Sequence, residues 1–421
     1  MFERIFVPEE FRDAVSDRAW LTALLDVEAA LARAEVRAGV IPAAAAAAIV
    51  DACDADRFDA VEVAEAGRAA GNPVEPLARA LADAAGDEAG RYVHWGATSQ
   101  DILDTAAMLV ARNVLGLLLE STKAVAADCA RLADTHRSTV LAGRTLLTQA
   151  VPTTFGSKAA GWLVAILEAR RGLARIRAGG LAVQLGGAVG TLASLEGHGL
   201  EVLRRLAEEL GLQEPLVPWH TNRVRIAELG SALAVAAGSL AKVGLDVALL
   251  GQTEVGEVRS TGGGASSTMP QKQNPVGSVL AIACARQVSA HASTLVEALP
   301  QEHERGLGGW HAEWPALSAA LAFTGGAAAG ARRALEELEV DPERMRANLD
   351  ELAMSERASY LLAERLGRRG AYEAVAEAAS SGRPLAEALY LEPAGLEPSS
   401  YLGSADEFVE RALNAYREET A

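Results

Sequence analysis

The segment from Ile226 to Gly251 constrains the fold of this chain more than any other feature of its sequence. After Glu228 its only charged residues are Lys242 and Asp246, and the rest is apolar or small. A helix that is apolar on every face is stable in water only when it is buried on every side. In a soluble protein, that environment is the middle of a helical bundle or an interface between subunits.

Two further segments, from Ala281 to Leu299 and from Trp314 to Leu338, are also long and rich in small residues. Alanine and glycine on facing helices allow the backbones to approach closely, which suits a long bundle shared between subunits. Alanine, leucine, glutamate and arginine dominate the composition and favour helix along most of the chain. The sequence therefore predicts an all-α fold around a long central helix bundle.

Helix start signals divide the predicted helices into three domains. A long helix is expected to begin near Ser99 and Asp101, because a Thr-Ser pair followed by an acid is typical of a helix N-terminus. Asp341-Pro342 has the form of an N-cap followed by proline at the first helical position. We expect an N-terminal helical domain over residues 1–98, the central bundle over 99–340 with a lid loop near 256–275, and a small C-terminal helical domain over 341–421.

Charge and cysteine content limit the partners and the compartment. The chain has 421 residues and a formal net charge of -17, which argues against nucleic acid or an anionic membrane as its main partner. Cys53, Cys129 and Cys284 are scattered without metal-ligand spacing, which is typical of a reduced, cytoplasmic protein. The longest apolar stretch, Leu229 to Ala241, is shorter than the ~20 residues that a membrane span needs. We therefore expect a soluble protein.

The run from Gly262 to Pro275 contains the residue types of a polar lid. Its glycines permit backbone conformations that other residues avoid, so such a segment can open and close. Lys272 offers a point charge for a carboxylate, Asn274 offers an amide and Ser266 offers a hydroxyl oxygen. Composition alone favours a plain surface loop, but the order Ser-Ser-x-Met-Pro-x-Lys-x-Asn-Pro is more specific than that.

Three other segments are dense in hydrogen-bond donors: His94 to Asp101, Gly143 to Gly156 and Gln301 to Trp314. In the first, Thr98 and Ser99 precede a helix whose free N–H groups and positive dipole end suit a carboxylate, although an ordinary N-cap explains the same spacing. The second places Arg144, Thr145 and Gln149 in an otherwise apolar turn, and such turns usually satisfy only their own backbone.

The third segment holds His303, His311, three acids and Arg305, which could suggest a metal site. The two histidines are not one helical turn apart, and three glycines between them would break a helix. We therefore favour an interpretation in which Arg305 binds a carboxylate while the acids and indoles support the turn. Four histidines lie in dense polar and aromatic motifs and are the candidates for titrating chemistry near neutral pH: His94, His220, His303 and His311.

The order of residues in the lid resembles the signature of the fumarase/aspartase superfamily, in which the first serine of the pair is the usual proton-abstracting base. The other segments resemble the separated regions that build the active site of that superfamily, and the resemblance covers essentially the whole chain. Within the superfamily, three runs are most like the cycloisomerases that act on 3-carboxy-cis,cis-muconate: Pro218-Trp219-His220-Thr221, Glu302-His303-Glu304-Arg305 and Trp310-His311-Ala312-Glu313-Trp314.

The resemblance implies three mostly helical domains and a homotetramer built on a twenty-helix core, with each active site shared among three subunits. It implies a di- or tricarboxylate substrate and neither a metal nor an organic cofactor. It gives catalytic roles to Ser266, His94 and Lys272. The substrate-binding residues that it implies are Asn72, Thr98, Ser99, Arg144, Thr145, Gln149, Ser267, Met269, Asn274 and Arg305.

Leu146 provides a chemical check on this resemblance. Lyases of the superfamily that expel a basic leaving group commonly carry a histidine after Gly-Arg-Thr, where this chain has a leucine that cannot transfer a proton. A carboxylate has a pKa of about 4 and leaves without a general acid, so Leu146 favours a cycloisomerase over adenylosuccinate- or argininosuccinate-type lyases. The chain departs from the usual residues of the subgroup at Thr148-Gln149, Val224, Ala265 and Gln273.

The activity implied by the resemblance is the cyclisation of 3-carboxy-cis,cis-muconate to a carboxymuconolactone, in aromatic catabolism through protocatechuate (the β-ketoadipate pathway). One alternative is a lyase that eliminates a weakly basic group such as nitrite from a substituted succinate to give fumarate. Another is a catalytically silent helical scaffold, against which the intact Ser266, Lys272 and Asn274 argue. The sequence leaves open whether Ser266 or a histidine such as His94 delivers the proton.

Overall fold

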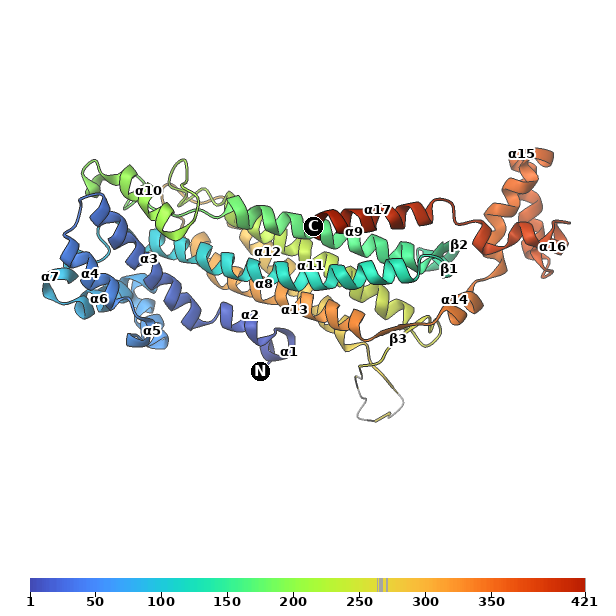
Figure 1. Cartoon of the computed structure of the whole chain (residues 1–421), viewed down its shortest axis with the longest axis horizontal. Coiled ribbons are helices and arrows are strands. Elements are labelled where there is room, and N and C mark those ends of the chain that lie inside the picture. Colours follow the sequence, from blue (N-terminus) through green and yellow to red (C-terminus); the bar gives the residue numbers. More distant parts are fainter. Residues whose placement is uncertain (263, 265–267, 270–271, 421) are drawn as a thin grey trace. The chain divides into compact units, whose positions relative to one another are not determined.

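A computed structural model describes residues 1–262, 264, 268–269 and 272–420 of the chain. The backbone is mostly helical, with four short strands among these residues (Figure 1). This confirms the predicted all-α class, while the predicted division into three domains stays a prediction. Contacts group the residues into two compact units: unit 1 contains Met1–Ser121, Ala169–Gly238 and Ala283–Ala329, and unit 2 contains Thr122–Glu168, Ser239–Ile282 and Gly330–Ala421.

Five long helices contribute residues to both units. They include the apolar segments from which the sequence predicts a bundle, and the first of them begins at Ser99, as expected. Their bounds are α8 (Ser99–Thr135), α9 (Phe155–Arg175), α11 (Val224–Leu250), α12 (Val276–Glu297) and α13 (Gly309–Glu336).

Three of these helices, α8, α11 and α12, are long and apolar enough to cross a membrane by length and composition alone. The expectation that no segment reaches this length is therefore wrong, because the apolar character of α11 continues past Lys242 to Leu250. In the single chain, 50% of the most apolar 18-residue stretch of α11 is buried. For the corresponding stretch of α12 the buried share is 33%. Much of their apolar surface is therefore left uncovered by the described residues of this chain.

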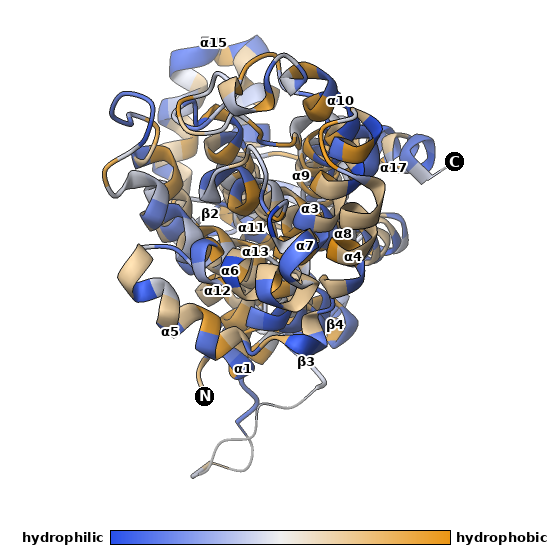
Figure 2. Ribbon diagram, turned by 90° about the vertical axis from the view of Figure 1, so that its left-hand side faces the viewer, coloured by the Kyte–Doolittle hydropathy of each residue, from blue (hydrophilic) through white to orange (hydrophobic). Residues whose placement is uncertain are grey.

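Unit 1 also contains eight further helices, which carry both hydrophilic and hydrophobic residues (Figure 2). α3 begins after the N-cap Ser16, whose hydroxyl accepts a hydrogen bond from Ala19 N–H at 3.2 Å, and it packs against α4 and α10. The bounds are α1 (Glu3–Phe6), α2 (Glu9–Ala14), α3 (Asp17–Arg37), α4 (Ala43–Ala52), α5 (Ala60–Ala70), α6 (Val74–Ala85), α7 (Asp87–Gly90) and α10 (Gly199–Leu210).

Two acidic residues of α3, Glu28 and Glu35, are almost completely buried. They are seven residues apart and therefore lie on the same side of the helix. Burial raises the pKa of Glu35 to about 9, and the charge of Glu28 adds to this effect. Glu35 therefore carries a proton at neutral pH, whereas Glu28 has an imidazole partner that is described below.

Replacement of Glu35 by glutamine should increase stability at high pH. The pKa of Glu35 is above its unfolded value of 4.5, so the stability from this group is lost as the pH rises from about 4.5 to about 9. Glutamine keeps the shape of the neutral acid without this loss. We expect Glu35→Gln to be more stable than the wild type by about 1–3 kcal/mol at pH 9, after relaxation around the charge, and equal to it near pH 4.5. Urea unfolding at a fixed protein concentration measures the stability of the variant and of the wild type at each pH. An equal difference in stability at pH 4.5 and at pH 9 would contradict the raised pKa of Glu35.

Unit 2 contains two antiparallel strand pairs and the C-terminal helices. β1 (Val140–Thr145) pairs with β2 (Thr148–Thr154), and β3 (Val258–Ser260) pairs with β4 (Leu338–Val340). α14 begins as predicted, because the Asp341 carboxylate accepts a hydrogen bond from Arg344 N–H at 2.9 Å and Pro342 occupies the first turn. The helices are α14 (Pro342–Asn348), α15 (Ser355–Ser380), α16 (Leu385–Ala388) and α17 (Ala405–Thr420).

Short irregular helical turns complete the fold. A π-helical turn, Ile176–Gly180, follows α9. The 3-10 turns are Ala55–Arg57, Ala193–Leu195, Glu351–Met354, Pro393–Leu396 and Pro398–Ser400.

Candidate active site

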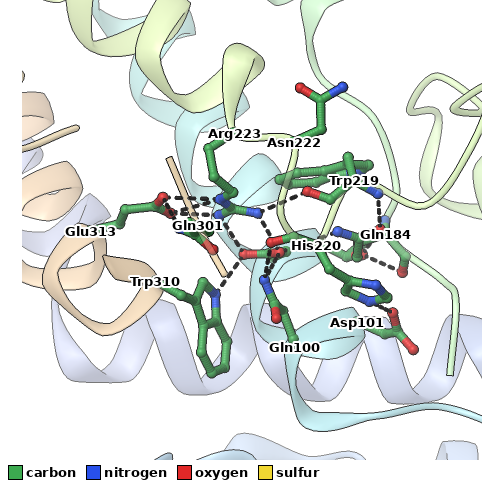
Figure 3. Close-up of polar contacts among 12 residues, drawn as sticks. Gln100, Asp101, Gln184, Trp219, His220, Asn222, Arg223, Gln301, Trp310 and Glu313 are labelled. Carbon is green, nitrogen blue, oxygen red and sulfur yellow. Dashed lines mark hydrogen bonds and ion pairs between the residues drawn. The ribbon is translucent and has the colours of Figure 1, made fainter. Parts of the chain in front are cut away.

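The N-terminus of α8 is organised around the buried carboxylate of Asp101. Asp101 accepts hydrogen bonds from the backbone N–H groups of Thr98 (3.0 Å), Gly186 (3.0 Å) and Gly187 (2.9 Å). Its Oδ1 also lies 2.6 Å from His220 Nε2. The contact with Thr98 is the return bond of a capping box, so the N-cap interpretation of this segment is confirmed for Asp101. The same carboxylate thus fixes the loop that contains Gly186 and Gly187 at the helix end, and it also contacts the imidazole of His220 (Figure 3).

One turn further along α8, Asp104 belongs to a buried ion-pair network centred on Arg223. Arg223 donates to both oxygens of Asp104, at 2.8 and 3.0 Å, and to Glu313 at 2.5 and 2.9 Å (Figure 3). Burial alone would lower the pKa of Arg223, but the two carboxylates overcome this effect and raise it. Asp104 also accepts from three other buried side chains: Gln100 Nε2 (3.2 Å), Gln184 Nε2 (3.3 Å) and Trp310 Nε1 (2.9 Å).

The Pro-Trp-His-Thr run is held against this network by its own backbone and indole. Trp219 N–H donates to Gln184 Oε1 at 2.8 Å, and Trp219 Nε1 donates to Val183 O at 2.8 Å. The Arg223 and Arg225 guanidinium groups lie 4.8 and 4.9 Å from the centre of the same indole. Each contact is of a kind that stabilises a rigid scaffold.

His94 lies near the same helix end and is paired with Glu28 of α3. His94 has a left-handed backbone conformation with φ of 58°, and its Nδ1 lies 2.6 Å from Glu28 Oε1. Burial would lower the pKa of His94, but the charge and hydrogen bond of Glu28 and the charge of Asp101 raise it. His94 thus lies four residues before Thr98, in the same segment and the same unit, and its ring is held by Glu28.

Arg305 contacts the loop that Asp101 fixes. It donates from Nη2 to Gly187 O at 2.6 Å and from Nη1 to Glu304 O at 2.7 Å. Burial lowers the pKa of Arg305, and the nearby charges of Asp101 and Asp104 oppose this shift. Its contacts in this structure are thus with backbone carbonyls, and its predicted binding of a substrate carboxylate stays a prediction.

Asn72 performs a helix-capping role in unit 1. Its Oδ1 accepts from Val74 N–H at 3.0 Å and Glu75 N–H at 3.2 Å, at the start of α6. A Cβ atom placed on the preceding Gly71 would lie 4.0 Å from His311 Nε2, so this segment lies beside the turn from Gln301 to Trp314. The rings of Trp310, His311 and Trp314 pack on one another, with centroids 4.7–5.1 Å apart.

In unit 2, Arg144 is paired with a buried acid. Both of its terminal nitrogens donate to Glu257, at 2.9 and 2.5 Å, and Asn348 Nδ2 donates to the same carboxylate at 3.0 Å. Gln149 donates to Asn348 O at 2.8 Å and accepts from Asp350 N–H at 3.0 Å. These contacts connect the β1–β2 hairpin with the region of α14, and they occupy the groups for which substrate binding is predicted.

The turn of this hairpin is exposed and strained. Thr145 ends β1, and the two turn residues, Leu146 and Leu147, have φ of 51° and 65°. A two-residue turn with both φ values positive normally contains asparagine and glycine. Leu146 is 99% exposed and Leu147 is 81% exposed, so their side chains gain no burial within this chain that would offset the strain.

Part of the predicted lid falls outside the described residues, and this part includes the predicted base Ser266 and the predicted binding residue Ser267. Among the described residues, Lys272 and Met269 are exposed, and Lys272 N–H donates to Met269 O at 3.0 Å. Asn274 Nδ2 donates to Gly264 O at 3.0 Å. The roles predicted for these residues stay predictions.

Several residues of the site were not singled out by the sequence: Glu28, Asp104, Arg223 and Glu257. One signal was available, because Asp101 and Asp104 are acids three residues apart at the start of a helix whose later residues are mostly apolar. Within the described residues, no group of three or more His, Cys, Asp or Glu side chains is arranged to hold a metal ion.

Comparison with known proteins agrees with this architecture. The sequence model of the lyase family matches residues 7–290 of this chain. A 3-carboxy-cis,cis-muconate cycloisomerase from Pseudomonas aeruginosa is 46% identical over 98% of this chain and 95% of its own length. A nitrosuccinate lyase from Streptomyces davaonensis is also 46% identical, over 95% of this chain and 91% of its own length.

Among solved structures, the 3-carboxy-cis,cis-muconate lactonizing enzyme from Pseudomonas putida matches with a TM-score of 0.92 and 42% identity, and the match covers 100% of both chains. The fold is therefore shared with this lactonizing enzyme over the full length of both chains. The chain belongs to the lyase family, which is the fumarase/aspartase superfamily that its Ser-Ser-x-Met-Pro-x-Lys-x-Asn-Pro run resembles.

Proposed function

We propose that this protein is a cycloisomerase that converts 3-carboxy-cis,cis-muconate to a carboxymuconolactone in the cytoplasm, as a step in aromatic catabolism. The observation that carries the proposal is the match with a lactonizing enzyme over the full length of both chains. The relative from Pseudomonas aeruginosa supports it, and so does Leu146, which leaves the hairpin without a proton donor for a basic leaving group.

In the proposed mechanism, one substrate carboxylate adds to a carbon–carbon double bond and closes the ring. The electron pair of that bond shifts to the carbon beside a second carboxylate and gives an enolate-like intermediate. Lys272, Asn274, Thr98 and Ser99 stabilise its charge with a cation and aimed hydrogen-bond donors. The carbon then takes up one proton, from Ser266 or from His94, to give the lactone.

We assign the remaining predicted contacts to substrate binding: Asn72, Arg144, Thr145, Gln149, Ser267, Met269 and Arg305. Arg144 is neutralised by Glu257, so it would orient the substrate by hydrogen bonds rather than add net charge. Net attraction for a trianionic substrate would come from Lys272 and from Arg305, whose hydrogen bonds in this structure go to backbone carbonyls.

The proposed active enzyme is a homotetramer in which each site takes residues from three subunits. The strained and exposed Leu146-Leu147 turn supports this, because a second subunit would bury it. The exposed apolar residues of α11 and α12 also support it, among them Leu245 and Val279 at 46% and 55% exposure. Sedimentation at micromolar concentration should give the mass of four chains of 43.8 kDa, and a monomer would contradict the shared site.

One alternative has a specific observation in its favour. The nitrosuccinate lyase shares the 46% identity of the cycloisomerase, although its match covers less of both chains. Nitrite is a weakly basic leaving group that Leu146 would also tolerate. Such an enzyme would remove a proton beside one carboxylate and release nitrite to give fumarate.

Product analysis in deuterated buffer separates the two functions. With 3-carboxy-cis,cis-muconate, the cycloisomerase should give a lactone with one deuterium at the newly protonated carbon, which NMR detects. With nitrosuccinate, it should release little nitrite. If the protein released nitrite quickly and left 3-carboxymuconate unchanged, its function would be that of the lyase and not that of the cycloisomerase.

A further inference from the structure

His94 and Glu28 form a close side-chain pair, in which the Glu28 carboxylate is buried and the His94 imidazole is partly exposed. Glu28 is 2% exposed in its side chain and His94 is 20% exposed, and the two are 2.6 Å apart. An ionised carboxylate only accepts hydrogen bonds, so His94 Nδ1 must carry the hydrogen of this contact. The nitrogen left for chemistry is Nε2, which has no hydrogen-bond partner in the part of the chain that the structure describes.

The charges around this pair favour the imidazolium form of His94. The charged groups that act on His94 are Glu28 from α3 and Asp101 from α8, and both raise its pKa. The neighbouring buried acid, Glu35, is neutral at pH 7 because burial raises its pKa to about 9. Cys53 is neutral as well, since burial raises its pKa to about 12. Glu28 is therefore the buried counter-charge that His94 contacts directly.

We infer that Glu28 is a positioning residue that orients His94 and keeps its imidazole protonated, so that His94 Nε2–H delivers the proton to the substrate carbon. This inference rests on the proposed function. In the step, the Nε2–H bond breaks and a C–H bond forms with the electron pair of the enolate-like intermediate. His94 becomes neutral and takes a proton back from solvent, which balances the single proton that lactonisation consumes.

The position of His94 supports this role over that of a structural histidine. His94 precedes the N-terminus of α8 by a few residues, where Thr98 and Ser99 are proposed to bind a substrate carboxylate. The Glu28 contact resembles the way in which a carboxylate holds the imidazole of a catalytic triad in one tautomer.

The test compares Glu28→Gln with Glu35→Gln, which removes the other buried carboxyl on the same side of α3. The rate at which diethyl pyrocarbonate modifies His94, followed by peptide mass spectrometry across pH, gives the pKa of His94 without any substrate. Glu28→Gln should lower this pKa by about one unit or more, as expected for loss of an adjacent opposite charge, and Glu35→Gln should leave it nearly unchanged. An unchanged pKa in Glu28→Gln, or an equal change in both variants, would overturn the inference.

The pH profile of kcat/KM on 3-carboxymuconate tests the catalytic part. Activity that depends on protonated His94 falls on the alkaline side, so in Glu28→Gln this limb should move to lower pH with the pKa of His94. The loss should be about tenfold or more at pH 8 and smaller at pH 6. A shifted pKa with an unmoved alkaline limb would overturn the role of His94 as proton donor.

Two further measurements keep the outcomes separate. If Glu28→Gln does not fold, Glu28→Asp retains the charge at a longer reach, and the pKa of His94 should then fall by less than one unit. If the wild type does not convert 3-carboxymuconate, the proposed function fails, and the proton delivery that rests on it fails too. The diethyl pyrocarbonate titration still decides whether Glu28 holds His94 protonated.

Discussion

Lys272→Ala is expected to lower kcat/KM on 3-carboxymuconate by about 10²–10³ or more, with the larger part of the loss in kcat. Losing one preorganised donor at a developing oxyanion typically costs about 3–4 kcal/mol. Lys272 would supply a full positive charge to an intermediate that carries several negative charges, so its loss should cost at least as much. The chain has no other cation in the run from Gly262 to Pro275 that could replace it.

The matched control is Lys123→Ala, which removes an exposed lysine of α8 that has no assigned role. Stopped-flow or steady-state absorbance at saturating and limiting substrate separates kcat from KM. A loss below about fivefold for Lys272→Ala, or a similar loss for Lys123→Ala, would show that Lys272 does not face the reacting atoms.

Arg223→Met is expected to destabilise the folded protein by about 3–5 kcal/mol, as is typical when one partner of a buried ion pair is removed. The substitution keeps much of the side-chain volume but leaves Asp104 and Glu313 buried without their guanidinium. Asp104 also accepts hydrogen bonds from Gln100, Gln184 and Trp310. The substitution should therefore weaken the packing of these side chains at the N-terminus of α8 as well.

Arg225→Met is the control for this prediction. Arg225 lies at a similar distance from the Trp219 indole but donates one hydrogen bond, to Gly180 O at 2.7 Å, and contacts no carboxylate among the described residues. Its replacement should cost about 1 kcal/mol. Urea unfolding at one fixed protein concentration compares the variants, and equal losses would mean that the ion pairs contribute nothing specific.

The helix boundaries could be predicted because the signals that set them are local. The Thr98 to Asp101 capping box and the Asp341-Pro342 start each act within four residues, and α8 and α14 begin where these signals place them. The apolar segments likewise indicate helices without any knowledge of their neighbours. The predicted end of the apolar stretch at Lys242 is wrong, because Lys242 interrupts the sequence of α11 without ending its apolar character.

The buried network could not be predicted because its members are far apart in the sequence. Arg223 is 119 residues from Asp104 and 90 residues from Glu313, and each resembles an ordinary surface charge when it is considered alone. Arg144 shows the same limitation, since its partner Glu257 is 113 residues away. Short motifs thus indicated where polar residues gather, and only the fold revealed which of them neutralise one another.

The most direct test of the proposed function is the ratio of kcat/KM for 3-carboxy-cis,cis-muconate to that for nitrosuccinate, measured on the purified wild-type protein in one buffer. Lactone formation is followed by ultraviolet absorbance and nitrite release by a colorimetric assay. The cycloisomerase should favour 3-carboxymuconate by about 10²-fold or more, which corresponds to about 2.7 kcal/mol of differential transition-state binding. A ratio below one, with nitrite released at every turnover, would contradict the account and identify a lyase instead.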